Sequence, residues 1–212
     1  MSTPAPPKPA RTLSALHTVD LLPSFRAIYE LVAPGAAGPE PWRRRKLSAA
    51  HELLALTQVS GRMTIQYLDL TGPIRAVFTL RVPVPCRRGG VGPFLVAPAA
   101  VVGLTYRQEA VLTPGSSFAE ILQPRDVFHP NVAPSYQPPG AQIICLGKLP
   151  AGIRVVDLVL MIYTAISLQS VTYSVTDTLG VMNANAALFL EANSSRIPLT
   201  REPFLFSKEE TQ

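Results

Sequence analysis

The stretch MTIQYLDLTGPIRAVFTLRVP, which covers residues 63–83, decides the fold class of this chain. It contains two strand-like segments, residues 63–70 and 74–83, on either side of Gly72-Pro73. A Gly-Pro pair between two such segments indicates a turn. The sequence therefore predicts two successive strands joined by a turn.

Further elements are predicted on both sides of this hairpin. Residues 101–112 and 118–122 are strand-like, and residues 86–98 are expected to form an irregular excursion between strands. Before the strands, apolar residues at helical spacing predict a helix over 42–58. After them, residues 156–168 are apolar nearly all round, which predicts a buried helix, and residues 183–192 predict a shorter one. The order of one helix, antiparallel strands and then helices indicates an α+β fold.

The domain organisation is expected to be simple. Residues 1–40 form an N-terminal extension that is partly disordered, with a short helix over 13–32 that Pro23 interrupts. Residues 34–41 form a linker of Gly, Pro and Ala, and residues 41–200 form one domain. Residues 201–212 are a C-terminal tail.

The composition limits the class of protein. Of the 212 residues, 47% are hydrophobic and 16% are charged, which favours a globular domain over a disordered chain. No apolar run is long enough to span a bilayer and no signal peptide is evident, so we expect a cytoplasmic protein that binds no membrane. Two cysteines give no disulfide framework.

The net charge of +5 comes largely from two short basic clusters, Arg43-Arg44-Arg45-Lys46 and Arg87-Arg88. Either cluster is suited to an acidic partner. Nucleic-acid binding is not expected, because the clusters lack the interleaved aromatic residues on which bases stack.

The residues with the most chemical content lie in two neighbouring segments. The first is Phe128-His129-Pro130-Asn131-Val132, and the second is Gln142-Ile143-Ile144-Cys145-Leu146-Gly147. The thiolate form of cysteine is a strong nucleophile, and it needs a polar or electropositive setting. By itself Cys145 fits either a catalytic thiol or a packed structural thiol, because cysteine is often buried.

The surroundings of Cys145 resemble the core of the ubiquitin-conjugating (E2) family. The matching landmarks are the His129-Pro130-Asn131 turn, the Ile144-Cys145-Leu146 segment, a loop, a buried helix and Asp177-Thr178-Leu179 before another helix. Asp177 lies 177 − 145 = 32 positions after the cysteine. The resemblance is clear over residues 128–190, thinner over 42–127 and absent before 40. It implies a ubiquitin-conjugating fold and points to a divergent bacterial member from an antiphage conjugation system.

The resemblance implies a role for each site residue. Cys145 would accept a ubiquitin-like protein as a thioester, and Asn131 would either donate a hydrogen bond to the oxyanion or brace the loop beside the cysteine. Asp177 would orient the attacking lysine and help its deprotonation. His129 and Pro130 would be structural. The cluster Arg43, Arg44, Arg45 and Lys46 would engage the activating enzyme, although its default reading is a solvated helix face.

The implied partners are a ubiquitin-like protein, an activating (E1-like) enzyme and a target protein whose amine receives the modifier. No cofactor is implied, because ATP is consumed by the activating enzyme. No metal is expected either, since the two cysteines lie 145 − 86 = 59 positions apart and the three histidines are scattered.

The chain also departs from the family pattern. Asn131 and Cys145 are 145 − 131 = 14 positions apart, which is wider than usual, and residues 133–139 form a proline-rich insertion between them. The tryptophan-containing loop that usually follows the cysteine is absent, as is the Tyr-Pro-rich approach to the His-Pro-Asn turn.

Three alternatives remain open from the sequence. A non-catalytic variant of the family would bind or scaffold a ubiquitin-like protein without carrying it. A cysteine hydrolase would need a base and an orienting group for Cys145, and His129 and Asn131 on one loop do not readily supply both. In the third alternative Cys86 is the reactive thiol, with Arg87 and Arg88 lowering its pKa.

Overall fold

A computed structural model describes the chain over residues 13–115, 117–137, 141–169, 181–193, 195, 200 and 202–205. The expectations for residues 1–12, for Asp177 and for residues 206–212 concern positions outside these ranges.

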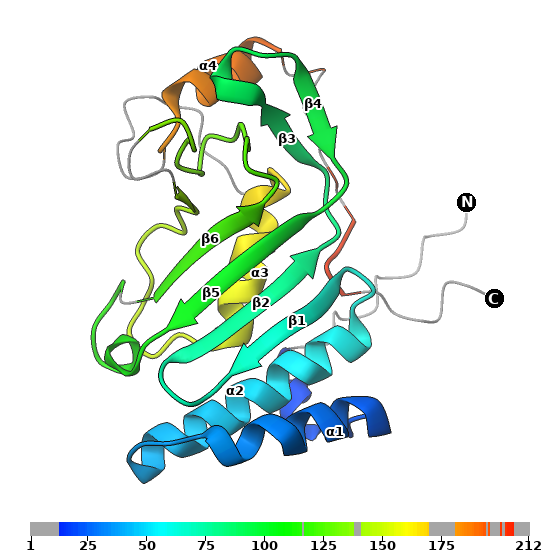
Figure 1. Ribbon diagram of the computed structural model, residues 1–212, viewed down its shortest axis with the longest axis vertical. Helices are drawn as coiled ribbons and strands as arrows, with labels where there is room; N and C mark the ends of the chain where they lie inside the picture. Colours follow the sequence, from blue (N-terminus) through cyan, green and yellow to red (C-terminus); the bar gives the residue numbers. More distant parts are fainter. Residues whose placement is uncertain are drawn as a thin grey trace, which may run out of the picture.

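The main sheet contains five antiparallel strands in the order β1-β2-β5-β6-β7 (Figure 1). Its strands are β1 (Met63–Asp69), β2 (Ile74–Leu80), β5 (Ala100–Tyr106), β6 (Ser117–Gln123) and β7 (Gln142–Ile143). The hairpin expected over residues 63–83 is confirmed, because β1 pairs with β2 in antiparallel register from Met63 opposite Leu80.

One face of this sheet is buried. Along β2 the residues Ile74, Ala76, Phe78 and Leu80 are almost fully buried, while Arg75 between them is exposed. This alternation follows from the period of two in a strand, which sends successive side chains to opposite faces. In Figure 1, α3 lies behind the sheet, on the side of the core.

Four α-helices are present in the described part of the chain. They are α1 (Pro23–Val32), α2 (Glu40–Val59), α3 (Val155–Ile166) and α4 (Ala184–Ala192). The helix α2 packs against β1 and α3 and buries Leu53, Leu54 and Leu56 completely. The three helices expected after residue 41 are therefore confirmed, and the chain has an α+β fold.

The segment before α2 packs along that helix. It contains the 3₁₀ turns η1 (Leu13–Thr18) and η2 (Ala33–Gly35) as well as α1, and it buries Leu16 and Leu21. The expectation that Pro23 interrupts a helix is wrong, because Pro23 is the first residue of α1. Proline suits this position, since the first helical N–H has no partner within the helix.

Two further expectations need correction. Residues 86–98 are not irregular, because β3 (Val84–Arg87) and β4 (Phe94–Ala97) pair as an antiparallel hairpin around the turn η3 (Arg88–Gly90). The strand expected over 101–112 ends at Tyr106 and is followed by the 3₁₀ turn η4 (Gln108–Val111). In both places the elements are short and are stabilised by tertiary contacts. An element of four residues is too short to show a clear period in the sequence.

Candidate active site

The structure brings Asn131 and Cys145 together through the backbone. Val132 and Ile144 form an antiparallel bridge, and the Ala133 N–H donates to the Ile143 carbonyl over 2.9 Å. The Cys145 N–H donates to the Asn131 carbonyl over 2.7 Å. The residues between Asn131 and Cys145 therefore form a loop whose two ends are paired. The separation of 14 positions in sequence does not keep the two residues apart in space.

The same cysteine segment is also held by the main sheet. The Ile144 N–H donates to the Ala119 carbonyl over 2.9 Å, and β7 pairs with β6. The Cys145 side chain is partly exposed and follows directly after these bonds, at the point where regular pairing ends. The backbone of Cys145 is therefore held by hydrogen bonds, and the residue remains partly exposed to solvent.

The described part of the insertion rests on the β3–β4 hairpin. A Cβ atom on Gly90 would lie 2.9 Å from Tyr136 Cε1, so the ring packs directly against that glycine. The Ser135 hydroxyl donates to Asp126 Oδ1 over 3.3 Å. Since Gly90 has a φ of +76°, a side chain there would be strained as well as crowded.

His129 holds the turn from inside the protein. The ring is fully buried, and Nδ1 accepts a hydrogen bond from the Asn131 N–H over 3.0 Å. An accepting Nδ1 carries no proton, so the neutral ring is protonated on Nε2. Burial lowers the pKa of His129 to about 3, although the Ala165 carbonyl acts in the opposite direction. His129 is therefore neutral near pH 7, but so low a pKa makes the ring a poor general base for Cys145.

Pro130 anchors the turn to the start of α4. Its carbonyl accepts from the Met182 N–H over 2.8 Å and from the Asn183 N–H over 3.0 Å. Asn183 is in turn the N-cap of α4, because its Oδ1 accepts from the Ala186 N–H. Sequence analysis placed a helix start at Asn183 but did not connect it with Pro130, and no local signal marks a contact across more than 50 residues.

Phe128 fixes the other end of the turn. Its N–H donates to the Pro85 carbonyl of β3 over 2.8 Å. Its ring meets the Phe189 ring of α4 edge to face, and the Arg87 guanidinium lies over both rings. Phe94 of β4 stacks on the ring of Phe189. These aromatic and cation–π contacts join the hairpin, the turn and α4.

The side chain of Asn131 is nearly buried and has an unusual environment. Its Oδ1 is buried and accepts no hydrogen bond from a described residue. The bracing of this loop comes instead from the Asn131 backbone, through Cys145 and His129.

Cys86 differs from Cys145 in accessibility. It is buried in β3, and its thiol donates to the Val84 carbonyl over 3.5 Å. Burial raises the pKa of this thiol. Arg87 does not activate it, because its guanidinium lies over the two phenylalanine rings and its Nε donates to the Gly92 carbonyl.

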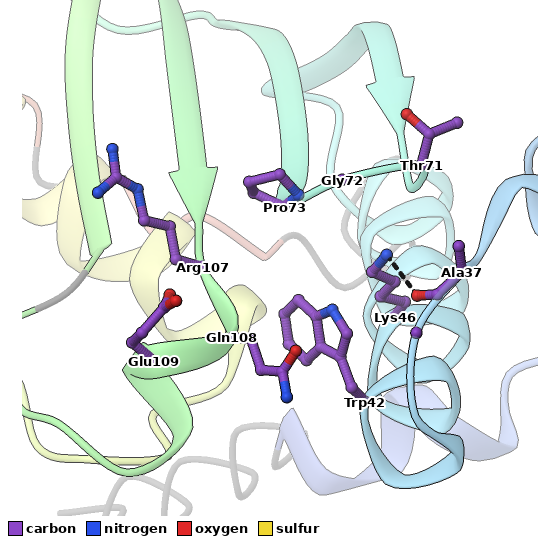
Figure 2. A pocket seen from close by; sticks show the side chains of 10 residues that line it. Ala37, Trp42, Lys46, Thr71, Gly72, Pro73, Arg107, Gln108 and Glu109 are labelled. Atoms are coloured by element: carbon purple, nitrogen blue, oxygen red, sulfur yellow. Dashed lines mark hydrogen bonds between the residues drawn. The ribbon is translucent and has the colours of Figure 1, made fainter.

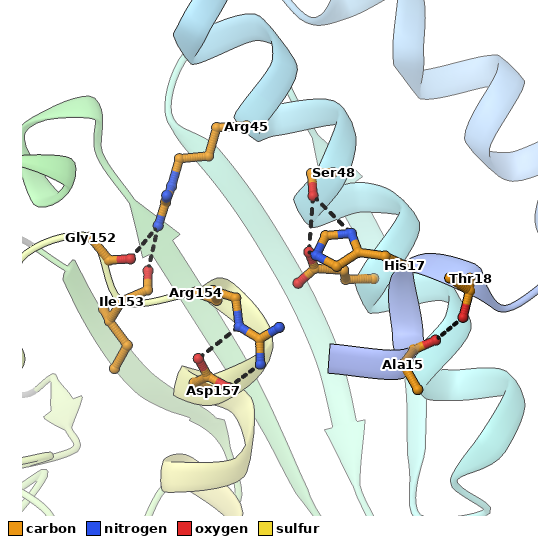
Figure 3. Close-up of polar contacts among 10 residues, drawn as sticks. Ala15, His17, Thr18, Arg45, Ser48, Gly152, Ile153, Arg154 and Asp157 are labelled. Atoms are coloured by element: carbon orange, nitrogen blue, oxygen red, sulfur yellow. Dashed lines mark hydrogen bonds and ion pairs between the residues drawn. The ribbon is translucent and has the colours of Figure 1, made fainter. Parts of the chain in front are cut away.

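The basic cluster on α2 does not form one surface. Arg43 and Arg44 are exposed and pair with Glu40. Arg45 instead donates to the carbonyls of Gly152 and Ile153, in the loop that leads to α3 (Figure 3). Lys46 is 1% exposed and donates to two further carbonyls. The charged groups of Arg45 and Lys46 are bonded within the fold, so of the four expected partner-binding residues only Arg43 and Arg44 remain candidates.

The replacement Lys46→Met is expected to lower the free energy of unfolding by about 2 kcal/mol. Lys46 Nζ donates to the Ala37 carbonyl over 2.8 Å and to the Leu70 carbonyl over 2.6 Å, and methionine leaves both acceptors without this donor. Arg44→Met is the matched control on the same helix, and its effect should stay within about 0.5 kcal/mol. Urea denaturation measures both, and equal effects would contradict the structural role of Lys46.

A pocket of about 600 Å³ lies beside this cluster (Figure 2). It is lined by the start of α2, the β1–β2 turn and the residues after β5, including Trp42, Thr71, Arg107 and Glu109. Neither Asn131 nor Cys145 is among the described residues that line it. The ammonium of Lys46 is turned toward the Ala37 carbonyl, which leaves Arg107 and Glu109 as opposite charges at the rim.

A second polar cluster joins the N-terminal segment to α2 (Figure 3). His17 Nε2 lies 2.6 Å from Glu52 Oε1, and the Ser48 hydroxyl donates to the same oxygen. Ser48 Oγ also lies 3.3 Å from His17 Nδ1, but the serine hydroxyl donates its proton to the carboxylate over 2.9 Å. This arrangement fits an anchor for η1.

No group of three or more His, Cys, Asp or Glu side chains suited to a metal occurs among the described residues. In the same part of the chain, every helix is too short or too polar to cross a bilayer. Asp177 lies outside the described residues, so its position relative to Cys145 stays a prediction.

The buried histidine makes stability depend on pH. A folded pKa of about 3 lies below the ordinary value, so the neutral ring stabilises the fold above about pH 6.5, and this contribution is lost as the pH falls toward 3. Between about pH 6.5 and about pH 5, His129 is expected to lower the free energy of unfolding by about 1–2 kcal/mol. Urea denaturation across this range measures the change.

The control for this prediction is His129→Asn. Its side-chain oxygen can accept from the Asn131 N–H in place of Nδ1, but it does not titrate in this range. The variant should show a shallower fall in stability between the same two pH values. An identical slope in both proteins would contradict the assignment to His129.

The chain matches no protein-family model, no curated protein and no solved structure.

Proposed function

We propose that this protein is a ubiquitin-conjugating (E2-like) transferase. In this proposal Cys145 accepts a ubiquitin-like protein from an activating enzyme as a thioester and passes it to an amine of a target protein. The α+β architecture, with α2, an antiparallel meander and then α3, is compatible with a ubiquitin-conjugating fold. Divergence from the family pattern supports a cytoplasmic bacterial system of antiviral defence as its setting.

The observation that carries the proposal is the pairing of Asn131 with Cys145. A hydrogen bond of 2.7 Å joins their backbones, so an asparagine and a partly exposed cysteine are neighbours in space. Acyl transfer passes through a tetrahedral oxyanion, which a preorganised donor stabilises. The main departure from the family pattern is the separation of 14 positions between Asn131 and Cys145. This pairing shows that the separation in sequence does not keep the two residues apart in space.

Within the proposal Asn131 acts as the oxyanion donor. Its backbone already braces the loop, and its side-chain Oδ1 accepts no hydrogen bond from a described residue. The rigid turn around it, bonded to β3 and to the start of α4, limits the movement of the amide. Asp177 would orient the incoming amine, as the resemblance implies.

A cysteine hydrolase is less well supported. That reaction needs a histidine close to the thiol with a pKa near neutrality. The pKa of His129 is about 3, its ring is buried and its Nδ1 lone pair accepts from the Asn131 N–H, so it does not meet this need.

The proposal is tested by incubating the protein with a ubiquitin-like protein, its activating enzyme and ATP. The gene neighbours of this chain are the first sources of both partners. Electrophoresis without reductant should show an adduct that disappears on addition of a thiol. Peptide mapping should place the acyl group on Cys145. A reaction that loads the activating enzyme but never this chain would exclude the transferase function.

A further inference from the structure

Lysines are scarce in this chain. There are four, Lys8, Lys46, Lys148 and Lys208, and two of them lie in the described part. The amine of Lys46 is buried and bonded to two carbonyls. Lys148 is exposed, and its amine forms no hydrogen bond or ion pair with a described residue. Among the described residues, Lys148 is therefore the only lysine whose amine can react.

Lys148 also lies within reach of the proposed nucleophile. It follows Cys145 by 148 − 145 = 3 positions, so the two Cα atoms are separated by at most about 11 Å. Gly147 between them has a φ of +71°, so the chain is not fully extended between the two residues. The flexible four-carbon stem of lysine can carry its amine back toward the sulfur.

The surroundings leave this path open. Cys145 is partly exposed, and Gly147 and Lys148 are exposed. Among the described residues, a Cβ atom added to Gly147 would meet no atom within 4 Å apart from its chain neighbours, so no described side chain packs against this glycine. An acyl group on the sulfur and the amine of Lys148 therefore share one accessible surface of the chain.

We propose that Lys148 is a self-modification site that receives the acyl group from Cys145 when no target amine is present. This inference rests on the proposed function. The neutral amine attacks the thioester carbonyl and forms a C–N bond, and the tetrahedral intermediate then breaks the C–S bond. Cys145 leaves as a thiolate, the proton lost by the amine returns to the thiolate or to solvent, and an isopeptide amide remains on Lys148. The step needs no oxidant or reductant.

The test uses the full chain and a short peptide thioester ending in glycine, which loads accessible thiols by exchange. Hydroxylamine cleaves thioesters and leaves amides intact, so mass spectrometry before and after this treatment separates the two products. We expect an early hydroxylamine-sensitive acyl group on Cys145, followed by a resistant one on Lys148.

Two variants sharpen the test. Lys148→Arg keeps the charge and should prolong the Cys145 thioester about tenfold, since the tethered amine is gone. Cys145→Ala should remove the resistant acyl group from Lys148. Unchanged acylation of Lys148 in Cys145→Ala would show direct attack by the reagent and overturn the inference. Equal thioester lifetimes in the wild type and Lys148→Arg would overturn it as well.

The same variants separate this inference from the proposed function. If the activating enzyme loads Cys145 but no amide forms on Lys148, only the self-modification is wrong. If the activating enzyme never loads Cys145 while the peptide thioester still acylates Lys148 through it, the transfer chemistry is correct and the proposed function is wrong.

Discussion

Replacing Cys145 with alanine is expected to abolish the thiol-sensitive adduct completely, whereas Cys86→Ala should leave it unchanged. The two cysteines differ in the properties that decide thiol reactivity. Cys145 is partly exposed beside Asn131, while Cys86 is buried in β3 and burial raises the pKa of its thiol. Electrophoresis without reductant, run on both variants in the same loading reaction, measures the effect.

A lower yield of folded protein would complicate this comparison, so thermal unfolding of each variant accompanies it. Cys145→Ser is a further control, because an oxyester on serine would resist mild thiols and still mark the acceptor position. An adduct that survives in Cys145→Ala and is lost in Cys86→Ala would reverse the assignment. That result would favour Cys86 as the reactive thiol, and the resemblance would then not describe this chain.

Asn131→Ala is expected to slow the discharge of the thioester to an amine about 100-fold, with a much smaller effect on loading. The reason is that a donor aimed at the developing oxyanion acts mainly in the transition state. The variant keeps the backbone bonds from Asn131 to Cys145 and His129, and it removes a side-chain oxygen that accepts no hydrogen bond. Single-turnover discharge of preloaded protein to free lysine measures this step separately.

Asn183→Ala is the matched control for this second prediction. It removes a buried asparagine from the same neighbourhood, but the lost group is the cap of α4, so the expected effect is about 1 kcal/mol of stability. It should not slow discharge selectively. If Asn131→Ala lowers thermal stability and reduces loading and discharge equally, the side chain braces the loop and does not act as the donor.

Parts of the structure with strong local patterns were predictable. The hairpin of β1 and β2, the buried α3 and the start of α4 at Asn183 all follow from period, turn residues or a capping residue. Predictions failed where the pattern was short or the residue ambiguous. The β3–β4 hairpin is only four residues long on each side, and Pro23 suits both the interruption and the start of a helix.

The sequence suggested a set of residues for the candidate site, which stays a prediction, but it did not give the geometry of these residues. His129, Asn131 and Cys145 were recognised from their order along the chain. The bond between Asn131 and Cys145 depends on the bridge at Val132 and Ile144, and the pairing of the turn with Met182 and Asn183 depends on where α4 packs. Such contacts join segments that are distant in sequence, so local composition does not encode them.

The sequence by itself determined the α+β class, the identity of the candidate nucleophile and the scarcity of lysine, because these depend on residue type and short-range period. Only the tertiary structure decided which groups are available. Lys46 and Arg45 belong to a basic cluster in the sequence, but their charged groups are bonded to carbonyls within the fold. The physical reason is that burial and hydrogen bonding depend on which distant segments pack together, and this packing changes the chemistry of a side chain without changing its identity.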